Sequence, residues 1–182
     1  PNIKVFISLS APDFPDFWQQ TAEAAGFNNM QAAWEAYMYG EVHQNLLELL
    51  RDEFPSTTFF TVPTGQAALT LRQMYDDDEL LDEVAFEGPK ATSLFTDTKG
   101  HQGDIIITTG RLVWLNALYG VDLPTYSYDT GFNTDLKDIA QTIMDEHFGK
   151  GLSHHTVPAI GAVGLLALGV LMLGLGAARL KK

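Results

Sequence analysis

The sequence contains no cysteine, so the chain has neither a disulfide framework nor a thiolate metal site. Basic residues are also scarce, with 11 Lys and Arg against 23 Asp and Glu. All the acidic residues and eight of the basic ones precede residue 157, which leaves that part of the chain with a net charge of −15. A surface this acidic repels phosphate backbones, and we therefore expect no nucleic-acid partner.

An export signal is absent as well. The sequence starts at Pro1 without a basic or apolar leader and enters an apolar run at once. Two readings stay open: a leader has been removed, or the sequence is the C-terminal part of a longer one.

One long apolar segment is present near the C-terminus. Val157–Ala178 has 22 residues without a charge, and a helix of that length spans roughly 30 Å, the thickness of a bilayer's apolar core. Arg179, Lys181 and Lys182 follow directly, and the positive-inside rule places them in the cytoplasm. The sequence predicts a globular part, 1–148, a linker, 149–156, and a membrane anchor with a basic end, 157–182. The globular part would face the periplasm or the cell exterior.

The order of elements before the anchor predicts an α/β domain with a parallel sheet. Ile3–Ser8 and Thr57–Val62 have the β-rich apolar composition of buried strands. Helices are predicted from Phe14 to Ala25, Met30 to Phe54, Gln66 to Tyr75, Asp104 to Tyr119 and Asp135 to Phe148, the last capped by Asn133 or Thr134. Two strong strands are few for an independent sheet, which favours the reading that further strands precede Pro1.

An Asp and a His stand close together in Ser93–Gly103 (SLFTDTKGHQG), just before a predicted helix. His101 has the chemistry of a general base, and Asp97 that of the acid that orients it. Spacing alone leaves two alternatives open. In one, Asp97 only caps the helix and His101 is a surface residue; in the other, His101, Asp97 and Asp104 bind a metal.

Two other histidines are weaker candidates for a catalytic role. His43 lies within a long helix and is expected at the surface. His147 is expected to act as a favourable charge at the end of the last helix. We expect neither a metal nor a cofactor.

The segment around Asp97 resembles the last conserved block of the SGNH/GDSL hydrolases, an Asp-x-x-His on a loop before the final helix. The region from residue 3 to about 125 resembles the part of some bacterial members that leads up to this block, including the turn Val62-Pro63-Thr64-Gly65. The resemblance implies a flavodoxin-like three-layer sheet whose first strands are missing, with Asp97 and His101 as two members of a catalytic triad. It also implies an esterase or acetylhydrolase acting on a small ester or an acylated glycan.

The sequence departs from this family in two ways. Three residues separate Asp97 from His101, where the family has two, and no Gly-Asp-Ser block supplies a nucleophile. Ser8 and Ser10 follow a strand, but the resemblance aligns that strand with a later one of the fold, so neither is assigned as the nucleophile. The alternative function is a non-catalytic binding or display domain held at the membrane.

The C-terminal tail resembles the PEP-CTERM-like sorting tails of bacterial surface proteins. Those tails have a short Val-Pro-type motif, an apolar span and a basic end, which here are Val157-Pro158, Ala159–Ala178 and Arg179–Lys182. The resemblance implies a sorting protease as a partner, cutting near Val157.

Overall fold

The computed structural model describes residues 3–149. Two parallel strands, β1 (Ile3–Ser8) and β2 (Thr57–Val62), form a sheet in which Ile3 lies opposite Thr57 and Ser8 opposite Val62. A smaller parallel pair is formed by β3 (Ala85–Glu87) and β4 (Ser93–Phe95). The prediction of an α/β fold with parallel strands is confirmed, and β3 and β4 are additions to it.

A nearly continuous helix connects β1 to β2 after a short first helix. The first helix comprises a 3-10 turn, Pro15–Phe17, and α1 (Trp18–Ala24). The long helix consists of α2 (Met30–Glu35), a π-helical segment, Ala36–Leu46, and α3 (Leu47–Glu53). Asn29 begins it, because its Oδ1 accepts the backbone N–H of Ala32 at 2.9 Å.

Three further helices follow β2, namely α4 (Thr64–Asp76), α5 (Asp104–Tyr119) and α6 (Leu136–Gly149). Their ranges agree with the predicted helices to within a few residues at each end. The predicted cap of α6 was wrong: Asp135 caps it, since its Oδ1 accepts the N–H groups of Lys137 at 3.2 Å and Asp138 at 3.0 Å.

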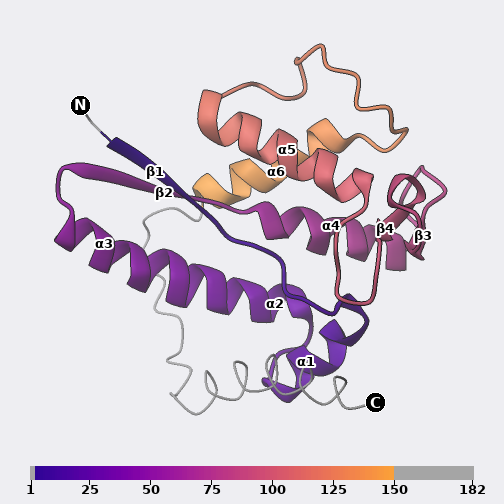
Figure 1. The fold of residues 1–182 in the computed structure, drawn as a ribbon, viewed down its shortest axis with the longest axis horizontal. Coiled ribbons are helices and arrows are strands. Elements are labelled where there is room, and N and C mark those ends of the chain that lie inside the picture. Colours follow the sequence, from indigo (N-terminus) through magenta and orange to yellow (C-terminus); the bar gives the residue numbers. More distant parts are fainter. Residues whose placement is uncertain (1–2, 150–182) are drawn as a thin grey trace.

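Helices cover both faces of the β1–β2 pair, with the long helix on one side and α5 and α6 on the other in the view of Figure 1. Toward the long helix, the ring of Phe59 of β2 lies tilted against that of Phe54, the residue that follows α3. On the opposite face Phe6 stacks against Phe60 with ring centroids 5.0 Å apart, and Trp114 of α5 meets Phe6 edge-on. The alternation of side chains along β2 therefore supplies one layer of packing to each side.

The predicted membrane anchor, Val157–Ala178, and its basic end lie outside the described residues, and so the anchor remains a prediction. Of the predicted linker, 149–156, only Gly149 is described, and it is the last residue of α6. Within residues 3–149, no helix has the length and apolar character needed to cross a bilayer.

Candidate active site

A closed turn between β4 and α5 carries both candidate residues. Thr96 and His101 close the turn through a 2.7 Å backbone hydrogen bond, and Gly103 donates its N–H to the carbonyl of Leu94 at 2.6 Å. β4 itself is fully buried, with Phe95 only 1% exposed, so one end of the turn is anchored in the core. The other end is the N-terminus of α5. The turn is thus held between two rigid elements.

The side chain of Asp97 organises this turn from within. Its Oδ1 accepts the backbone N–H groups of Lys99 at 3.0 Å, Gly100 at 3.1 Å and His101 at 3.3 Å. Its Oδ2 accepts from His101 Nδ1 at 2.5 Å. The structure therefore brings together the two residues that the sequence singled out. One carboxylate fixes both the backbone and the ring of the histidine.

Gly100 makes the longer spacing between Asp97 and His101 compatible with this contact. Its φ of +97° lies in the region that favours glycine, and its N–H reaches the carbonyl of Asp97 at 3.0 Å. The additional residue is accommodated by a tight left-handed turn, and the two side chains still face each other.

The hydrogen bonds favour the ionised form of Asp97. The bond from the His101 ring lowers the pKa of Asp97 most, and the backbone N–H groups of His101 and Gly100 lower it further. An ionised carboxylate can only accept, so Nδ1 of His101 must carry the proton that it donates. Neutral imidazole then presents a bare lone pair on Nε2. The side chain of His101 is 67% exposed, and no described residue bonds to Nε2.

The loop that follows β1 is fixed against this turn. Phe14 adopts a φ of 58° and donates its N–H to the carbonyl of Lys99 at 2.9 Å, while the ring of Pro15 lies next to Gly100. Nevertheless, neither Ser8 nor Ser10 is hydrogen-bonded to His101. The hydroxyl of Ser8 bonds to that of Thr64 at 2.5 Å, and no hydrogen bond connects Ser10 to the histidine.

The alternative reading as a metal site receives no support from the arrangement of the side chains. Asp104 pairs with Lys90, whose Nζ lies 3.3 Å from its Oδ1. Among residues 3–149, no three His, Cys, Asp or Glu side chains are grouped so that they could hold a metal ion.

A second polar cluster, which the sequence did not predict, lies inside the fold. His147 is only 5% exposed; its Nε2 lies 2.9 Å from the carbonyl of Thr61, and its Nδ1 lies 3.0 Å from the hydroxyl of Tyr39. His43 Nδ1 lies 2.5 Å from Thr61 Oγ1. The sequence predicted only a favourable charge at the end of α6, whereas the structure places His147 inside the fold. A signal for burial was present, because Ala140, Ile143, Met144 and His147 share one helix face.

Because of this cluster, we expect the protein to be less stable at acidic pH. Burial lowers the pKa of His43 from its ordinary value of 6.5, and the charge of Arg51 lowers it further. Below pH 6.5 the unfolded chain therefore binds a proton at His43 that the folded chain resists. We expect the free energy of unfolding to fall as the pH drops through this range.

Urea unfolding at several pH values measures this effect. His43→Gln is the control, and its stability should fall less steeply between pH 6.5 and the lower pKa of the folded state. Equal slopes for the two proteins would contradict the assignment.

Comparison with known proteins finds no family model, no curated protein and no solved structure that matches this chain.

Proposed function

We propose that Asp97 and His101 are the acid–base pair of a serine esterase of the SGNH/GDSL type. The observation that carries the proposal is the 2.5 Å bond between His101 Nδ1 and the carboxylate of Asp97, in a histidine whose side chain is exposed. A triad needs this arrangement, because the acid holds the tautomer whose outer nitrogen can accept a proton. A mere helix-capping Asp would require neither the ring contact nor an exposed histidine.

The chemistry assigned to the pair is proton transfer. His101 Nε2 removes the proton of a serine hydroxyl as its oxygen attacks the ester carbonyl, and Asp97 stabilises the imidazolium that forms. The proton then passes to the departing alcohol as the acyl–oxygen bond breaks. Water, deprotonated by the same nitrogen, releases the acid and restores the serine.

The serine belongs, in this proposal, to a Gly-Asp-Ser segment that lies next to the described elements in a larger three-layer sheet. No Gly-Asp-Ser triplet occurs among the 182 residues. The same proposal includes acylated glycans or small esters as substrates, a sorting protease as a partner, and display of the domain outside the cell by 157–178.

A second candidate is a membrane-displayed binding domain without catalysis. The observation in its favour is that no hydroxyl of residues 3–149 bonds to His101. A domain of this kind would retain the turn for its structure alone.

Ester hydrolysis distinguishes the two candidates. The protein expressed from its own gene should hydrolyse p-nitrophenyl acetate, and His101→Gln should reduce kcat by at least about 10³-fold. His43→Gln is the matched control, since it removes a histidine outside the turn. Absence of hydrolysis by the unmodified protein, or an unaltered kcat in His101→Gln, would leave the binding domain as the better account.

A further inference from the structure

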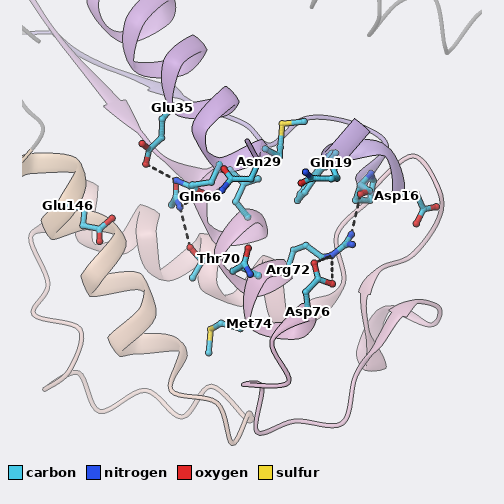
Figure 2. A pocket seen from close by; sticks show the side chains of 16 residues that line it. Asp16, Gln19, Asn29, Glu35, Gln66, Thr70, Arg72, Met74, Asp76 and Glu146 are labelled. Atoms are coloured by element: carbon cyan, nitrogen blue, oxygen red, sulfur yellow. Dashed lines mark hydrogen bonds and ion pairs between the residues drawn. The ribbon is translucent and has the colours of Figure 1, made fainter. Parts of the chain in front are cut away.

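A pocket of about 500 Å³ opens between α1, α2, α4 and α6, and it does not contain Asp97 or His101. This volume is typical of sites for small molecules. Its floor is apolar, because the buried side chains of Trp18, Met30 and Leu69 line it. Its walls are polar, as Figure 2 shows for the amide and carboxylate side chains that surround the opening.

Two glutamines on facing helices fix the polar wall. Gln31 of α2 and Gln66 of α4 exchange hydrogen bonds in both directions, at 2.9 and 2.8 Å. Their remaining N–H groups reach Glu35 at 2.8 Å and Thr70 at 3.3 Å. These bonds hold both amide planes in place, and each amide oxygen retains a second lone pair for a ligand.

Asn29 supplies donors that complement these acceptors. Its Oδ1 is engaged in capping α2, which turns the Nδ2 group away from the helix. No described residue accepts from this group, and the side chain lines the pocket. These three side chains therefore offer oriented, uncharged donors and acceptors to a ligand in the pocket.

The charges around the pocket exclude anionic ligands. Four carboxylates line it, those of Asp16, Glu35, Asp76 and Glu146, against a single basic residue among the described lining. That residue, Arg72, is already paired within the lining: its Nε contacts both oxygens of Asp76, at 2.9 and 2.8 Å, and one terminal nitrogen reaches the carbonyl of Pro15 at 3.2 Å. A phosphate or carboxylate would meet net negative potential. An acyl chain would leave the polar walls without partners.

We propose that this pocket binds an uncharged saccharide. Sugar hydroxyls donate and accept, so they match the fixed amide oxygens of Gln31 and Gln66 and the Nδ2 group of Asn29 together, while the apolar floor receives a ring face. Pro15 connects the two sites, since it lines the pocket and also lies against Gly100 of the turn that carries His101.

The test is titration of the full chain with glucose, xylose and N-acetylglucosamine, followed through the side-chain and backbone amide signals in NMR. At least one sugar should bind with a millimolar or lower Kd and shift the side-chain amides of Gln31, Gln66 and Asn29. Glucuronate, which adds a carboxylate to glucose, should bind more weakly than glucose. Absence of binding by all three sugars, or tighter binding of glucuronate, would overturn the proposal.

Two variants show whether binding uses this pocket. Asn29→Ser keeps a helix-capping hydroxyl and removes the amide donors, so we expect a Kd about 3- to 10-fold higher with the fold unchanged. Asn45→Ser is the control, because Asn45 is exposed on the π-helical segment and bonds to Glu41 away from the pocket. Equal affinity of the Asn29→Ser variant and unmodified protein would place the sugar elsewhere. Binding is measured without ester hydrolysis, so failure of the esterase proposal leaves this result standing.

Discussion

Replacing Asp97 by Asn should reduce kcat for ester hydrolysis by on the order of 10⁴-fold, the loss seen when a triad acid becomes an amide. An amide can donate to Nδ1 of His101 as readily as it accepts. It thereby allows the tautomer in which Nε2 carries the proton and cannot act as a base. KM should change far less, because Asp97 contacts the histidine and not the substrate in this account.

Asp129→Asn is the control for this substitution. Asp129 is exposed on a loop, where its carboxylate accepts the backbone N–H of Gly131 at 2.9 Å. The control substitution therefore removes the same negative charge, but outside the turn that carries His101. Circular dichroism of both variants checks that they fold. A folded Asp97→Asn protein with the kcat of the control would remove Asp97 from the mechanism.

Gly103→Ala should lower the free energy of unfolding by about 3 kcal/mol, the upper range for overpacking a well-packed site. A Cβ at this position would overlap the carbonyl oxygen of Ser93, which belongs to buried β4. Backbone atoms cannot move aside as a flexible side chain does. The strain would act directly on the anchor of the turn that carries Asp97 and His101, so activity should fall with stability.

Gly110→Ala is the matched control, because no atom beyond its chain neighbours and the backbone of its own helix lies within 4 Å of the Cβ it would add. It lies inside α5, where alanine is preferred over glycine by about 0.5–1 kcal/mol, so the control should be more stable than the unmodified protein. Urea unfolding gives both values. A Gly103→Ala protein as stable as the Gly110→Ala protein would contradict the packing described here.

The larger elements could be predicted from the sequence because their signals are local. Thr57–Val62 consists only of β-branched and aromatic residues, and Asp104–Tyr119 ends at Gly120, whose φ is +62°. The proximity of Asp97 and His101 was also accessible, since four residues of chain leave the two side chains little distance to cover. The bond between them depends on the left-handed turn at Gly100, which the spacing alone does not specify.

Features that depend on contacts between distant segments were not predicted. β4 has three residues, and it becomes a strand by pairing with β3 and by packing in the core. The cluster of His43, Thr61 and His147 joins three elements separated by up to 104 residues. Residue types over so short a segment as Ala36–Leu46 do not distinguish a π-helix from an α-helix. The π-helical geometry of this segment could therefore not be predicted from the sequence either.

The central claim is that Asp97 and His101 form a catalytic acid–base pair. The protonation state of His101 tests this claim most directly, because it depends on neither the nucleophile nor the substrate. Nitrogen-15 NMR of the neutral imidazole, assigned with His101→Gln, reports which ring nitrogen carries the proton. The account predicts a protonated Nδ1 and a bare Nε2, and a loss of this preference in Asp97→Asn. A protonated Nε2 in the unmodified protein would mean that the exposed nitrogen cannot accept a proton, and Asp97 and His101 would not be the acid–base pair of a hydrolase.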